Sequence, residues 1–158
     1  MQFPQLDVRS LSGVDRSLPR DLPAQRTLLL LPFQQWQQRQ VDAWIARAEH
    51  AGFDADLTAP ADELPQYAVI EVPCISWRWG PVRRFIDGGM TAGIRIPVIL
   101  ARTWTTYTDV GRAQRSLGIP DSAHTWVGVV AANGEVLAHA YGEPDDVSWP
   151  RIAEAMRG

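Results

Sequence analysis

The chain has 158 residues, 46% of them hydrophobic and 21% charged, with a formal net charge of −3, which is ordinary for a folded globular protein and argues against disorder. All 15 basic residues are Arg and lie scattered along the chain, so no nucleic-acid-binding stripe is expected. One Cys excludes an internal disulfide and a CxxC redox pair. The longest aliphatic run, 28–31, is too short to cross a membrane. We expect one domain over 1–158, in a cytoplasmic protein.

The first predicted elements are a covering strand and a βα unit. Residues 6–26 contain Gly13 and two prolines, which favours an edge strand or hairpin that covers one end of a sheet. The apolar run 27–33 predicts a buried strand that passes directly into a helix. The helix has apolar residues at helical spacing and ends at Gly52, in the position typical of a C-terminal cap. Its apolar stripe consists of Val41, Trp44, Ile45 and Ala48.

The middle of the chain predicts a second βα unit and a further strand. Two prolines and several acidic residues indicate a loop over 53–66, followed by a buried strand over 67–77. Gly80-Pro81 is typical of a helix start. The run 96–107 predicts extended backbone, and Asp109 is positioned to cap a short helix over 110–117.

The C-terminal third gives the clearest local signals. Two strand-like runs in 125–142 flank Asn133-Gly134, the dipeptide that a two-residue type I′ hairpin turn prefers. Ser148 is expected to cap a last helix, in which Trp149, Ile152 and Met156 share one face.

This order of elements resembles the thioredoxin-like superfamily in its peroxiredoxin or redoxin elaboration. The resemblance rests on SLSGVDRSLPRDLPAQRTLLLLPF, YTDVGRAQRSLGI and TWVGVVAANGEVLAHAYG, and it covers nearly the whole chain. It implies an α/β fold with a central mixed sheet flanked by helices and an N-terminal extra strand or hairpin. A weaker similarity, through Val41-Asp42-Ala43-Trp44 and Tyr107-Thr108-Asp109, is to the mitochondrial ATP-synthase assembly factor family, whose members lack the CxxC pair.

The catalytic motif of the thioredoxin family is missing. A thioredoxin has Trp-Cys-Gly-Pro-Cys at the helix start, where this chain has 36–40, Trp-Gln-Gln-Arg-Gln. The resemblance therefore places Gln37 and Gln40 at the two thiol positions, and glutamine has no ionisable nucleophile. The cis-proline of the family would fall close to His124.

An antiparallel strand starts where its parallel neighbours end, so the helix start, the end of the second main strand and His124 should meet at one sheet edge. Apolar walls with a few hydrogen-bonding groups are typical of small-molecule sites. Arginines beside a helix N-terminus could add a rim that favours anions. The predicted cleft comprises Trp36, Gln37, Arg39, Gln40, Cys74, Trp77, Trp79 and His124, and the alternative is a solvated helix start with ordinary aromatic packing.

Catalytic roles have weaker support. Cys74 with His124 would form a nucleophile and base only at hydrogen-bonding distance, and a lone Cys at the end of an apolar strand is more often a small buried hydrophobe. No metal-ligand spacing, phosphate-binding loop or hydrolase motif is present, so we expect no metal and no cofactor.

Three functions follow from these observations. The first is a redox-inactive thioredoxin-like protein that binds a protein partner or a small ligand at the edge of the lost dithiol. The second is a non-redox enzyme that acts on a hydrophobic or aromatic molecule in a Trp-lined pocket. The third is a thiol enzyme that uses Cys74 alone. The oligomeric state does not follow from the sequence.

Overall fold

A computed structural model describes residues 1–58, 62–74, 96–106 and 110–158. The predicted strand beyond Cys74, the helix expected from Gly80-Pro81 and the cap at Asp109 lie outside these residues. In the part that the structure describes, no helix is both long and apolar enough to cross a membrane.

The centre of the molecule is a four-stranded mixed sheet in the order β4-β3-β6-β7. Strand β3 (Arg26–Leu31) runs parallel to β4 (Tyr67–Glu71) and antiparallel to β6 (Trp126–Ala131). Strand β7 (Val136–Tyr141) completes the hairpin with β6. All of the β3 residues from Thr27 to Leu31 are buried, as expected for a strand that is covered on both faces.

A second sheet of three strands, in the order β2-β1-β5, packs beside the first. Strands β1 (Leu6–Ser10) and β2 (Asp15–Leu18) form the predicted N-terminal hairpin, and β5 (Trp104–Thr106) pairs antiparallel with β1. The prediction of extended backbone over 96–107 is wrong in its first half, because α3 (Ile96–Arg102) precedes β5. A short apolar run has no periodicity that separates a buried helix from a strand.

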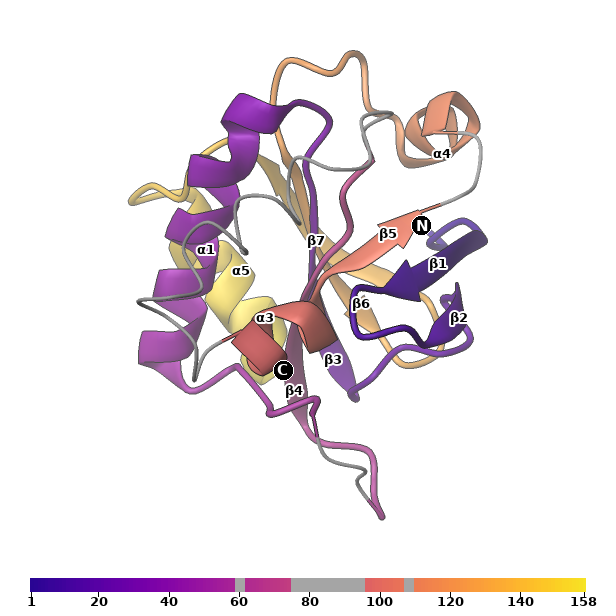
Figure 1. Ribbon diagram of the computed structural model, residues 1–158. Coiled ribbons are helices and arrows are strands. Elements are labelled where there is room, and N and C mark those ends of the chain that lie inside the picture. The colour runs from indigo at the N-terminus through magenta and orange to yellow at the C-terminus, as the bar shows by residue number, and fades with distance from the viewer. Residues whose placement is uncertain (59–61, 75–95, 107–109) are drawn as a thin grey trace.

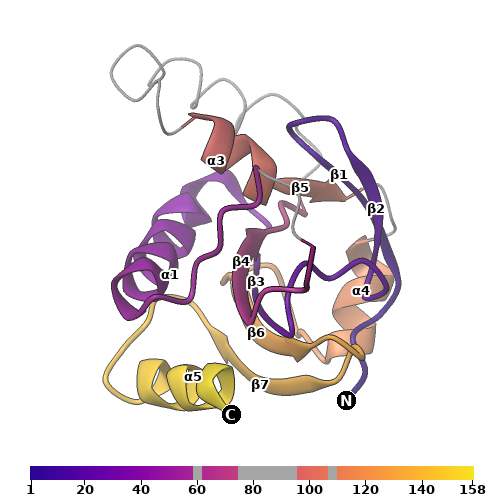
Figure 2. The same cartoon turned by 90° about the horizontal axis from the view of Figure 1, so that it is seen from below.

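Helices cover the four-stranded sheet from one side, and the small sheet lies on the other (Figures 1 and 2). The helical turn η1 (Gln35–Gln37) leads into α1 (Gln38–Ala51), which lies beside α5 (Ser148–Arg157). Both helices pack on one face of the sheet, where Leu28, Leu30 and Val127 contact their apolar stripes. The short helix α4 (Val110–Leu117) lies on the opposite side with the small sheet.

The second core lies between the two sheets. It combines alternate residues of β3, such as Leu29 and Leu31, with Leu6, Val8 and Trp104 of the small sheet. Because successive side chains of a strand point to opposite faces, β3 supplies both cores. The sequence LLLL over 28–31 is therefore apolar at every position.

Two local predictions are corrected. A type I′ turn needs positive φ at both central residues, but in the described residues only glycines have positive φ. Gly134 (φ 90°) is instead the last residue of a three-residue loop, in which its N–H donates to Ala131 O at 2.8 Å and the Ala131 N–H donates to Glu135 O at 2.9 Å. Ser148 does not cap α5, since the Asp145 carboxylate accepts the N–H groups of Val147 and Ser148. A carboxylate accepts these bonds more strongly than a hydroxyl, which explains the exchange of roles.

Candidate functional site

Three chain segments meet at the end of β3, as the strand directions require. Leu31 is paired with Trp126 at the start of β6, so the preceding loop 122–125 lies beside the start of η1. On the other side, the N–H of Cys74 donates to Pro32 O at 2.9 Å. The helix start, the end of the β4 segment and the loop that carries His124 are thereby brought together.

Gln37 is a buried crosslink within this edge. Its side chain is fully buried, its Oε1 accepts the N–H of Phe33 at 2.8 Å, and its Nε2 donates to Ser122 O at 2.8 Å. Phe33 lies two residues before the helical turn, so one amide connects the strand end, the turn and the loop. The hydrogen-bonding capacity of Gln37 is used inside the protein, and it does not face an open cleft.

Gln40 has a similar role one turn later. It is 6% exposed, and its Oε1 accepts the N–H of Thr125 at 3.0 Å. Gly142 lies next to it, close enough that an added Cβ would come 3.7 Å from the Gln40 amide nitrogen and 3.8 Å from Nδ1 of His124. The two glutamines at the expected thiol positions thus hold α1 to the segment that leads into β6.

The outward-facing residues of the edge are aromatic and charged. Trp36 is 46% exposed, and its indole N–H donates to Gln34 Oε1 at 3.1 Å. Gln34 Nε2 in turn donates to Ser122 O at 2.8 Å. The Arg39 guanidinium carbon lies 5.9 Å from the centre of the Trp36 ring, and its Nε lies 3.7 Å from Glu143 Oε1. His124 is exposed, and its Nδ1 lies near Gly142, the residue next to Glu143. We call Trp36, Arg39 and His124 the helix-start face.

Cys74 lies inside the core between the sheets. Its thiol donates to Val72 O at 3.2 Å, and burial raises the pKa of Cys74 to about 12. At neutral pH the thiol is therefore protonated, whereas a thiol nucleophile must be a thiolate. His124 is exposed and Cys74 is buried, and among the described contacts none joins them.

Trp77 and Trp79, which the sequence assigns to the same cleft, lie outside the described residues. Within the described ranges no group of three His, Cys, Asp or Glu side chains could hold a metal ion. In the described part the one cis peptide is Leu18–Pro19, so the bonds around His124 are trans. The position of the family's cis-proline has a different backbone here.

Two cavities lined by described residues lie away from this edge. One, of about 170 Å³, lies beside the Glu49–Arg102 ion pair. The larger, of about 610 Å³, lies between the β1–β2 turn and α3 and is lined by Arg16. Sequence analysis missed Arg16. The one signal in the sequence is that Arg16 lies two positions before the apolar Leu18 in a short strand, and residues two apart in a strand point to the same face.

The arrangement of strands and helices defines a thioredoxin-like fold. A putative electron transfer protein from Aquifex aeolicus VF5 matches with a TM-score of 0.63 and 10% identity, covering 99% of this chain and 94% of that one. A thiol-disulfide oxidoreductase from Bacteroides fragilis NCTC 9343 matches with a TM-score of 0.59 and 9% identity, over 99% and 98%. A putative thiol:disulfide interchange protein from Chlorobium tepidum has a TM-score of 0.57 and 13% identity, over 98% and 95%. No protein-family model and no curated protein matches the sequence.

Proposed function

We propose that this protein is a thioredoxin-like binding protein that performs no dithiol chemistry and recognises a protein partner through the helix-start face. The observation that carries the proposal is Trp36, a large aromatic side chain that stays 46% exposed at the edge where the fold's redox site would lie. Trp and Arg are the residue types that most often dominate the binding energy of protein interfaces. Here Trp36 and Arg39 lie side by side.

Two observations support the absence of dithiol chemistry. They are the number of cysteines in the chain and the hydrogen bonds that the side chains of Gln37 and Gln40 make. The sequence has one cysteine, and burial raises its pKa to about 12. Gln37 and Gln40 occupy the expected thiol positions and bond to backbone groups. The names of several structural neighbours describe thiol exchange in those proteins, and this chain has one cysteine thiol where that exchange needs two.

A protein partner is favoured over a small-molecule substrate. A catalytic pocket at this edge would need polar groups free to orient a substrate, but the Gln37 amide and the Gln40 side-chain carbonyl are already bonded to backbone groups. Trp36 is also held in place through Gln34, which lowers the entropy cost of presenting it to a partner. The indole and the Arg39 guanidinium then offer an apolar surface with a positive rim.

The redox half of the proposal is tested by insulin disulfide reduction with dithiothreitol as the electron source. We expect the wild-type protein and Cys74→Ser to leave the uncatalysed rate unchanged. Catalysed turnover that survives Cys74→Ser would refute this half, since no other sulfur nucleophile exists in the chain besides methionine thioethers.

The binding half is tested with the photo-crosslinking residue p-benzoylphenylalanine at Gln35, which is exposed beside Trp36. We expect a discrete protein adduct in cells of the source organism, reduced several-fold by Trp36→Ala or Arg39→Glu. The matched control places the same probe at Val147, which is 78% exposed and is not part of the helix-start face. The assignment of the face would be overturned if the adduct formed in equal yield at both positions. It would also be overturned if Trp36→Ala and Arg39→Glu left the yield at Gln35 unchanged.

A further inference from the structure

The cavity between the β1–β2 turn and α3, here called the hairpin cavity, has apolar walls and one cationic side chain. Its volume of about 610 Å³ lies within the range of about 300–1,000 Å³ that is usual for small-molecule sites. Its described lining contains no acidic residue. The lining consists of Ser12, Val14, Arg16, Leu57, Thr58, Pro97, Leu100 and Ala101.

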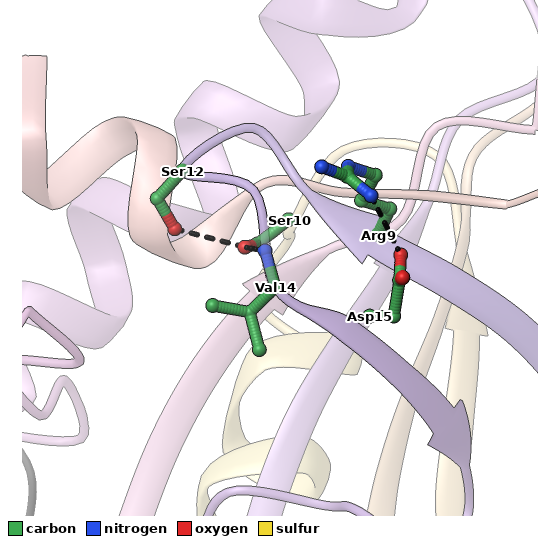
Figure 3. A network of polar contacts seen from close by, with 5 residues as sticks. All are labelled: Arg9, Ser10, Ser12, Val14 and Asp15. Atoms are coloured by element: carbon green, nitrogen blue, oxygen red, sulfur yellow. Dashed lines mark hydrogen bonds and ion pairs between the residues drawn. The ribbon is translucent and has the colours of Figure 1, made fainter.

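The turn that forms one wall of the cavity is held by a polar network (Figure 3). Ser10 Oγ accepts the N–H of Val14 at 3.0 Å and lies 2.8 Å from Ser12 Oγ. Across the same hairpin, Arg9 and Asp15 form an ion pair at 3.1 Å. Figure 2 places the turn next to α3. The side chains of Val14 and Arg16 are therefore carried by a backbone that is already fixed before a ligand arrives.

The Arg16 side chain stacks on an aromatic ring. Among the described residues, the N–H donors of its guanidinium have no hydrogen-bond acceptor. Its guanidinium carbon lies 4.5 Å from the centre of the buried Trp104 ring. In the described part of the chain, no hydrogen bond or ion pair occupies this guanidinium. Asp21 is the acid whose charge acts on Arg16, but its carboxylate already accepts hydrogen bonds from Arg20 and from the Ser17 N–H.

The partial burial of Arg16 affects the pKa of its guanidinium. Burial lowers the pKa of Arg16 from its ordinary value, with the charge of Asp21 opposing that effect. Arginine still remains protonated, so the cation is partly stripped of water without receiving an acceptor in return. An anion that entered the cavity would supply that acceptor.

We propose that the hairpin cavity binds a monocarboxylate with an apolar body, its carboxylate paired with the Arg16 guanidinium and its chain packed against Val14, Leu57 and Leu100. The planar guanidinium matches a carboxylate with two parallel hydrogen bonds. One cation among apolar side chains and two hydroxyls, those of Ser12 and Thr58, favours a ligand with one charge at its end. The site is separate from the helix-start face, so it does not rest on the proposed partner binding.

Isothermal titration calorimetry with decanoate, below its micelle concentration, tests the proposal on the full-length protein. We expect saturable one-to-one binding, with decanol and acetate each at least tenfold weaker because one lacks the charge and the other lacks the chain. Arg16→Gln should weaken decanoate binding at least tenfold and leave decanol binding within twofold. Failure of decanoate to saturate, or decanol binding as tightly as decanoate, would overturn the proposal.

Two further variants separate the site from general charge effects. Arg9→Gln removes one cation from the same hairpin, outside the cavity lining, and should change the decanoate affinity less than twofold. Val14→Asp adds a negative charge at the wall without removing a buried side chain, and should weaken decanoate at least fivefold even if Arg16→Gln does not fold. If Arg9→Gln and Arg16→Gln weakened decanoate binding equally, the effect would come from the net charge of the protein. That result would contradict the assigned site.

Discussion

The helix-start face and the hairpin cavity use polar side chains in opposite ways. At the helix start, the amides of Gln37 and Gln40 are buried and bonded to backbone groups, so the groups that remain for a partner are the exposed Trp36 and Arg39. In the hairpin cavity, Arg16 lies in a mostly apolar lining, and no residue that the structure describes accepts a hydrogen bond from its guanidinium.

This difference separates a structural polar group from one available for binding. A buried amide with every bond satisfied stabilises the fold, and its removal leaves its partners unsatisfied. A partly desolvated cation without an acceptor costs free energy until a ligand pairs with it. The position of a residue in the fold is therefore a weaker guide to its role than the fate of its hydrogen bonds.

The largest expected effect concerns Cys74, the one cysteine of the chain. Because its pKa is raised to about 12 from an ordinary value of 9.0, its thiolate fraction at pH 8 should be about a thousandfold below that of a free thiol. We expect iodoacetamide to label native Cys74 at least that much more slowly than a model peptide thiol, as measured by intact mass against time.

The control for this measurement is the same protein in denaturant, where the labelling rate should return to that of the peptide thiol. Native labelling within tenfold of the peptide would show that Cys74 is exposed or activated. It would reopen the third function, a thiol enzyme.

Loss of the Gln37 crosslink should destabilise the protein strongly. Gln37→Leu keeps the side-chain size but leaves the buried Phe33 N–H without its acceptor, whereas Ser122 O still receives Gln34 Nε2. We expect the free energy of unfolding to fall by about 2–3 kcal/mol in urea titrations at pH 7.

Gln35→Leu is the matched control, because Gln35 is exposed in the same helical turn and should change stability by less than about 0.5 kcal/mol. If the two variants were equally stable, the Gln37 amide would not be a structural crosslink. Its placement at a binding cleft, as the sequence predicted, would then regain support.

Periodicity and strand direction predicted most of the fold. The apolar stripe of α1, its end at Gly52 (φ 79°) and the buried strand β3 are confirmed, as is the thioredoxin-like arrangement. The failures are local. In 96–107 a helix and a strand share the same apolar composition, and at 145–148 the acidic residue that accepts the N–H groups at the helix start lies three positions before the expected one.

The site was harder to predict, because its chemistry depends on side-chain direction. The sequence placed Gln37 and Gln40 at the correct edge, since strand directions determine which segments meet. It could not show that both amides turn inward to Ser122 and Thr125, which depends on how closely the loop approaches the helix. Arg16 escaped notice because its cavity joins segments more than 80 positions apart, with no shared motif.

The smallest effect is expected for Trp36 itself, and it distinguishes a binding residue from a core residue. Trp36→Ala should lower the free energy of unfolding by less than about 1 kcal/mol, because much of the ring is already in water. Trp44→Ala, in the helix α1 that follows η1, is the comparison: its ring is fully buried and its indole donates to Gly142 O at 2.7 Å, so its loss should be about 3–5 kcal/mol. A Trp36 variant as unstable as the Trp44 variant would show that the exposed tryptophan serves the fold. Small destabilisation together with lost crosslinking at Gln35 would instead separate binding from folding at the helix-start face.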